Sequence, residues 1–206
     1  RVLAWDLYNE PGNTNGLSYG HSELDDKHRY TLALLKKVFA WARLEDPSQP
    51  LTAGVWRSRG GRWLGAEPDD VGAALYGFML DNSDIVTFHS YVDDKDTTAL
   101  IDALRPLHRP MICTEYMARG HGSTFEDILP LLARRDIGAI HWGLVSGRSQ
   151  TIYPWRSWFA LARFWDGLFS YEPEPWHHDL LRADGSAYSE DEVALIGQVI
   201  DSSARR

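Results

Sequence analysis

Residues 5–12 read Trp-Asp-Leu-Tyr-Asn-Glu-Pro-Gly and follow the apolar residues Val2, Leu3 and Ala4. An apolar run that meets Pro-Gly indicates a short strand that stops there. Asn9 and Glu10 therefore stand at the carboxyl end of that strand. In a barrel of parallel strands this end carries the chemistry, because the loops that follow the strands form the catalytic face.

The same pattern recurs along the chain. Apolar, β-type runs are found at residues 51–56, 85–91, 111–116 and 137–144. Three of these runs end in side chains with catalytic or binding chemistry: His89 with Tyr91, Glu115, and Trp142. Helical spacing of apolar residues separates the runs, at 23–43, 71–79, 96–107 and after a Ser123–Glu126 capping box. Alternating strands and helices predict an α/β fold with a parallel sheet and right-handed crossovers.

The last quarter of the chain is predicted to be mostly loops and helices. We expect a loop over 147–158, a helix over 159–169, a helical turn over 176–182 and a tight turn at Asp184-Gly185. Ser189 with Glu192 forms a second capping box before a final helix that runs through residue 200.

Composition excludes several classes of function. The 206 residues suit one domain, and the net charge of -8 argues against a nucleic-acid partner, which requires a basic surface. No apolar run reaches the roughly 20 residues of a membrane span. Cys113 is the single cysteine, so neither an internal disulfide nor a thiolate metal cluster can form.

Glu10 and Glu115 are far apart in sequence, yet each stands at the end of a predicted strand. In a parallel barrel such strand ends converge on one mouth. Two facing carboxyl groups are the machinery of glycoside hydrolysis, one as general acid and the other as nucleophile or as the base for water. The same pair could instead bind a divalent cation, or the two could be ordinary exposed acids.

Three short motifs and one tryptophan favour glycoside hydrolysis over the other two interpretations. They are Asn9-Glu10-Pro11, His89-Ser90-Tyr91, Thr114-Glu115-Tyr116, and Trp142 on the last strand. Together they resemble the retaining β-glycosidases of glycoside hydrolase clan A, most closely cellulase-like members of family 5 and related xylanase-like families. The resemblance implies a (β/α)8 TIM barrel. Residues 1–206 would then be a single partial TIM-barrel catalytic domain, the second half of the barrel with strands four to eight and the C-terminal helices, lacking strands one to three.

The resemblance also implies a role for each site residue. Glu10 would be the acid/base and Glu115 the nucleophile, so Glu10 has to hold a proton near neutral pH while Glu115 remains a carboxylate. Asn9 would bind the sugar 2-hydroxyl. His89 and Tyr91 would line the floor of the site, with Tyr91 donating a hydrogen bond to Glu115. Trp142 would stack on the sugar.

The expected activity is hydrolysis of β-glycosidic bonds in a polysaccharide or oligosaccharide by retaining double displacement, of endo-glucanase or xylanase type, without a cofactor or metal. The alternatives are a catalytically inactive carbohydrate-binding barrel and a metal-dependent hydrolase that uses Glu10 and Glu115 as ligands, for which the expected histidines are lacking. The sequence leaves the oligomeric state open. The sequence begins at Arg1, directly before the first strand, and so decides neither for nor against a signal peptide; a secreted or periplasmic location suits such an enzyme.

His141, His177 and His178 are interpreted as structural residues rather than as parts of the site. Strand alternation directs His141 towards the helices. His177-His178 has no acid or histidine at a convincing ligand spacing, so a surface turn is favoured over a metal site.

Overall fold

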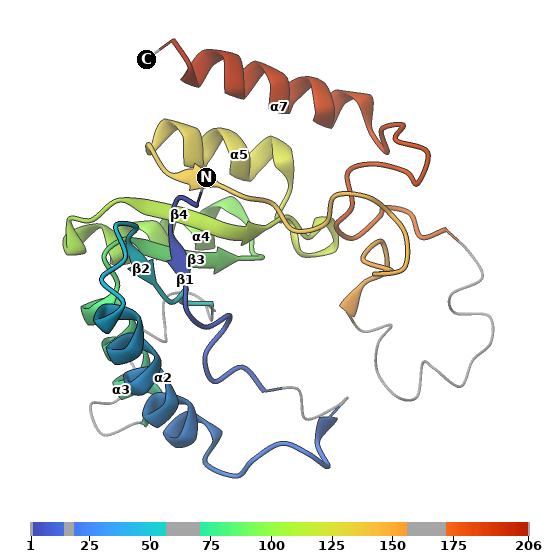
Figure 1. Cartoon of the computed structure of the whole chain (residues 1–206). Helices are drawn as coiled ribbons and strands as arrows, with labels where there is room; N and C mark the ends of the chain where they lie inside the picture. The colour runs from blue at the N-terminus through green and yellow to red at the C-terminus, as the bar shows by residue number, and fades with distance from the viewer. Residues whose placement is uncertain (1, 15–18, 57–70, 156–171, 206) are drawn as a thin grey trace. The chain divides into compact units, whose positions relative to one another are not determined.

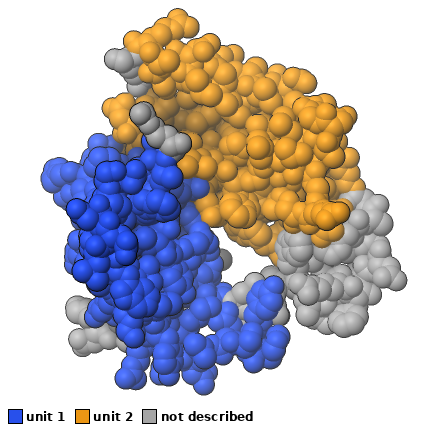
Figure 2. Space-filling view, in the orientation of Figure 1, with its two compact units in different colours: residues 1–89, 98–114 blue, residues 90–97, 115–206 orange. Residues whose placement is uncertain are grey.

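The structure is a computed structural model that describes residues 2–14, 19–56, 71–155 and 172–205. The chain forms two compact units (Figure 2). Unit 1 comprises Arg1–His89 and Thr98–Thr114, and unit 2 comprises Ser90–Thr97 and Glu115–Arg206. The architecture is mixed α/β with small parallel sheets, in agreement with the predicted class. Among the described residues the strands form two small sheets and no closed barrel.

Unit 1 is built on parallel strand pairing. Strand β1 (Trp5–Asp6) pairs with β2 (Leu51–Thr52), with Trp5 opposite Leu51 and Asp6 opposite Thr52. A parallel bridge between Val55 and Phe88 continues this pairing from the segment after β2 to β3 (Val86–Ser90). Strand β3 is buried along its whole length, as expected for a parallel strand covered on both faces.

Two helices of unit 1, α2 (Lys27–Leu44) and α3 (Val71–Asn82), lie side by side (Figure 1). Helix α2 buries Thr31, Leu35 and Phe39, which are four residues apart and therefore share one face. The Phe39 ring meets that of Phe78 on α3 edge to face at 5.7 Å. This apolar contact holds the two helices together.

Beyond β3 the chain continues through α4 (Asp94–Leu104), a 3-10 turn η2 (Arg105–Leu107) and β4 (Met111–Tyr116). Strand β4 has the predicted bounds, since Pro110 precedes the apolar run and fixes where it begins. It is the middle strand of a three-stranded sheet with the order β3-β4-β5, in which β5 is Gly138–Ala139.

Unit 2 contains the 3-10 turn η3 (Arg119–His121), α5 (Phe125–Arg134) and α7 (Glu190–Ser203), and α5 packs on α7 (Figure 1). The Arg119 guanidinium forms an ion pair with Glu192 of α7, with an Nε–Oε1 distance of 2.7 Å. Both side chains are more than nine-tenths buried. Arg119 also donates to the Trp176 and Asp179 carbonyls, so one side chain ties η3, α7 and the segment around Trp176 together.

Several local predictions are wrong, and each error has a tertiary cause. Thr124, not Ser123, caps α5 by accepting the Asp127 amide, because the Ser123 hydroxyl is buried and bonds the Met117 amide and the Ser90 carbonyl. Residues 176–182 form no helical turn. Leu181 instead makes bridges to Val145 and Ala187, and hydrogen-bonding partners outside the segment replace helical ones.

Two further boundaries differ from the expectation. Helix α2 begins at Lys27 rather than at residue 23, and the last predicted strand, 137–144, is reduced to Gly138–Ala139. The tight turn at Asp184-Gly185 is confirmed, with the Gly185 amide bonded to the Arg182 carbonyl and Gly185 at φ +87°. The predicted helix at 159–169 lies outside the described residues, as do residues 156–158 of the predicted loop at 147–158.

In the described part of the chain, no helix combines the length and the hydropathy needed to cross a membrane.

Candidate active site

Glu10 follows strand β1 (Trp5–Asp6), separated from it by residues 7–9, and is held in a tight turn. Its carbonyl accepts the Asn13 amide at 3.0 Å, and its carboxylate accepts a hydrogen bond from the Asn13 side chain. Glu10 has φ +45°, in the left-handed region that non-glycine residues rarely adopt, and such strain costs on the order of 1–3 kcal/mol.

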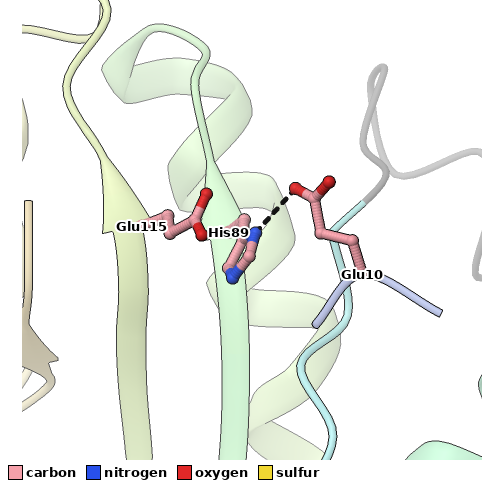
Figure 3. Close-up of side chains that lie close together, drawn as sticks. All are labelled: Glu10, His89 and Glu115. Atoms are coloured by element: carbon pink, nitrogen blue, oxygen red, sulfur yellow. Dashed lines mark hydrogen bonds and ion pairs between the residues drawn. The ribbon is translucent and has the colours of Figure 1, made fainter. Parts of the chain in front are cut away.

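His89 is the polar partner of Glu10 in unit 1. Its Nδ1 lies 2.8 Å from Glu10 Oε1, and the His89 side chain is 3% exposed (Figure 3). The His89 amide donates to the Val55 carbonyl, so the strand pairing fixes the backbone position from which the imidazole side chain extends. A proton lies between the two side chains in either ionisation state. It is carried by Nδ1 when Glu10 is a carboxylate and by Glu10 when that group is a carboxylic acid.

Glu115 has its own polar partner in unit 2. The Tyr91 hydroxyl donates to Glu115 Oε2 at 2.6 Å, a length typical of an O–H group bonded to an ionised carboxylate. Such a bond favours the charged form of the acid and fixes one of its oxygens. The hydrogen bond expected between these two residues is therefore present.

The tripeptide His89-Ser90-Tyr91 carries both partners. Ser90 is buried, its hydroxyl bonds Thr97 at 2.7 Å, and its carbonyl accepts from Ser123. Strand β3 ends at Ser90, so His89 lies within the strand and Tyr91 directly follows it. One anchored segment thus supplies the hydrogen-bonding group for each of the two acids.

Within unit 1, the Glu10 and His89 side chains are also of the type that binds a divalent cation. Their polar atoms already bond each other, with His89 Nδ1 2.8 Å from Glu10 Oε1, so this pair suits proton transfer.

The other two predicted site residues are exposed and make no comparable contacts. Asn9 is exposed and makes no side-chain hydrogen bond to another described residue. Trp142 is 44% exposed, and its amide donates to the Tyr116 carbonyl at the end of β4. Both side chains are thus exposed at the surface of their own unit.

His141 was assigned to the structure rather than to the site, and its contacts agree with that assignment. Its ring lies against Phe125, the first residue of α5, with the centroids 5.2 Å apart. Burial lowers its pKa.

The prediction of a surface turn at His177-His178 is wrong. Both residues are buried, 2% and 1% exposed, and their rings contact each other and Trp155. Burial lowers the pKa of His177 to about 3 and that of His178 to about 4, so both are neutral near pH 7. Nothing in the spacing of these residues signals their burial, because it depends on segments distant in sequence.

The comparisons with known families, curated proteins and solved structures returned no match for this chain.

Proposed function

We propose that this chain is the catalytic part of a retaining β-glycosidase, with Glu10 as acid/base and Glu115 as nucleophile. The observation that supports this best is the His89-Ser90-Tyr91 segment, which gives one acid a proton-sharing partner and the other a hydrogen-bond donor. The reaction requires this difference, because one carboxyl group must carry a proton while the other must be charged.

In the first step, Glu115 attacks the anomeric carbon and forms a glycosyl ester. The bond from that carbon to the leaving oxygen breaks, and the oxygen takes the proton of Glu10. Glu10 is then a carboxylate, which the N–H of His89 Nδ1 stabilises. In the second step, Glu10 removes a proton from water, the water oxygen attacks the anomeric carbon, and Glu115 leaves as a free carboxylate.

The remaining parts of the proposal concern the fold and the ligand. The parallel pairing of β1 with β2, and the bridge from Val55 to Phe88, fit one side of a (β/α)8 TIM barrel. In that architecture Asn9 binds the 2-hydroxyl of the reacting sugar, and the exposed ring of Trp142 is its stacking platform. The substrate is a β-linked oligosaccharide or polysaccharide.

Hydrolysis of a panel of aryl β-glycosides tests the proposal. Turnover should be unchanged by a chelator and lost in Glu115→Gln, since an amide cannot form the ester intermediate. Glu126→Gln, an exposed acid on α5, is the matched control and should retain full activity. Turnover that survives in Glu115→Gln refutes the assignment. Sugar binding without turnover by the parent protein points to a carbohydrate-binding protein.

The two acids can be told apart by their leaving-group dependence. Glu10→Ala should spare substrates with good leaving groups far more than natural ones, because their departure needs little protonation. Azide should rescue Glu10→Ala as a β-glycosyl azide and Glu115→Ala as the α-anomer. The reverse pattern would mean that the two roles are exchanged.

A further inference from the structure

Tyr91, the donor to Glu115, is itself held between rings of unit 2. Its ring meets Trp155 edge to face, with the centroids 5.0 Å apart and the planes at 89°. It also meets the His178 ring at 5.6 Å and 66°, and Trp155 lies 5.5 Å from His178. Edge-to-face pairs are the arrangement that the charge distribution of aromatic rings favours. Two such neighbours restrict how far the Tyr91 ring can tilt, and with it the position of the hydroxyl.

The His178 ring beside Tyr91 is neutral and is held in place by a hydrogen bond. Its Nδ1 bonds the Met117 carbonyl, which can only accept, so Nδ1 carries the ring proton. Nε2 is then an unprotonated nitrogen, buried and without a partner among the described residues. Burying a polar nitrogen without a hydrogen-bond partner typically costs more free energy than an ordinary hydrogen bond contributes. A leucine or phenylalanine at this position would avoid that cost. The His178 imidazole is thus an uncharged ring whose orientation the Met117 carbonyl fixes.

Both rings belong to backbone segments that pair with each other. The His177 amide donates to the Ile152 carbonyl at 2.7 Å, and the His178 amide donates to the Thr151 carbonyl at 3.2 Å. The Thr151 hydroxyl then bonds the Asp179 carboxylate at 2.8 Å. The pairing fixes the spacing between residues 151–155, which include Trp155, and the segment that contains His178. The Tyr91 ring rests against both.

We propose that Trp155 and His178 are positioning residues of the glycosidase reaction, which hold the Tyr91 ring so that its hydroxyl stays 2.6 Å from Glu115 Oε2. Neither residue touches the substrate in this role. Both act through Tyr91, and the inference rests on the proposed function of Glu115. A small displacement of a catalytic group suffices for a large loss of rate, so support of this kind has a measurable effect.

Trp155→Leu is the main test variant, because Trp155 is 39% exposed and its replacement leaves little buried cavity. We expect kcat on aryl β-glycosides to fall roughly tenfold, equivalent to about 1.4 kcal/mol, with KM within about twofold of the parent value. Trp155→Phe, which keeps a ring against Tyr91, should recover most of the lost rate. A change confined to KM would make Trp155 a sugar platform and overturn the proposal.

A double-mutant cycle shows whether Trp155 acts through Tyr91. In the Tyr91→Phe background, which lacks the hydroxyl, Trp155→Leu should lower kcat by less than about twofold further. Equal losses in both backgrounds would overturn the proposal. His178→Phe gives a second cycle with the same expectation, and Trp155 decides the matter if that buried replacement does not fold.

The nucleophilic step can be measured directly by covalent labelling. The 2,4-dinitrophenyl 2-deoxy-2-fluoro-β-glycosides of glucose, xylose and cellobiose form slowly hydrolysed esters with a nucleophilic carboxylate, and intact-mass spectrometry follows the adduct. Labelling of Glu115→Gln at the parent rate would refute the proposed function itself. Loss of labelling in Glu115→Gln together with parent-like labelling of Trp155→Leu would refute only the positioning role.

Discussion

Buried neutral histidines should make unit 2 sensitive to mild acid. Burial, reinforced by the nearby positive potential of His178, His121 and Arg119, lowers the pKa of His177 to about 3. Burial also lowers the pKa of His178 to about 4, although its bond to the Met117 carbonyl opposes the shift. In the unfolded chain both groups titrate near their ordinary pKa of about 6.5.

The direction of the effect follows from proton binding. Between about pH 6.5 and pH 4 the unfolded chain binds protons at His177 and His178 that the folded chain does not bind, so the free energy of unfolding falls as the pH falls. From pH 6.5 to pH 5 the loss is about 1.5 pH units at 1.36 kcal/mol each, or about 2 kcal/mol per histidine. Asp179, whose pKa burial raises, takes up its proton more readily in the folded chain than in the unfolded chain and so opposes this loss as the pH falls.

A combined loss of about 4 kcal/mol is a large share of the roughly 5–15 kcal/mol that stabilises a domain. Urea unfolding followed by tryptophan fluorescence at pH 7 and at pH 5 measures it. His177→Leu should remain folded at pH 7, because it removes a buried Nε2 without a partner among the described residues, and it should halve the loss between the two pH values. His21→Gln, at an exposed site of unit 1, is the control and should leave the pH dependence unchanged.

Two outcomes would refute this reasoning. One is a parent protein whose stability changes by less than about 1 kcal/mol between pH 7 and pH 5, since protonation of the unfolded chain alone should exceed that value. The other is a His177→Leu variant with the same pH dependence as the parent, which would place the titrating group elsewhere.

Two further predictions concern the packing of unit 2 and can be read from urea midpoints at pH 7. Glu192→Gln leaves Arg119 buried without its charged partner, so we expect a loss of about 3–5 kcal/mol; a loss below about 1 kcal/mol would contradict the burial of the pair. Gly143→Ala should cost at least about 2 kcal/mol, because Gly143 has φ +85° and a Cβ there would lie 2.7 Å from that of His178. Gly147→Ala, whose Cβ would meet nothing within 4 Å, is the matched control, and equal costs for both would refute the steric argument.

The sequence predicted best those elements whose ends are marked locally. Strand β4 has its predicted bounds, and α7 begins where Ser189 caps it by accepting the Glu192 amide. The second half of that capping box is different, because the Glu192 carboxylate pairs with Arg119 instead of returning to the cap. The local pattern therefore predicted where the helix begins, but the Glu192 side chain pairs with Arg119, which is 73 positions away in the sequence.

Burial was the property that the sequence predicted least well. Ser123 fits a helix cap as well as Thr124 does by pattern, and only its burial under the Met117 and Ser90 backbone removes it from that role. His177 and His178 read as a polar surface turn for the same reason. Polar residues are usually exposed, so polarity alone misplaces the few whose partners come from other parts of the chain.

The sequence by itself determined which chemically versatile side chains stand at the ends of strands, because apolar runs and chain-breaking residues are local signals. It placed Glu10 after one apolar run and Glu115 at the end of another. Only the tertiary structure decided their partners: His89, 79 positions from Glu10, and Tyr91, 24 positions from Glu115. Hydrogen bonds over such separations form only when strands and loops pack side by side, and no local pattern specifies which groups then meet.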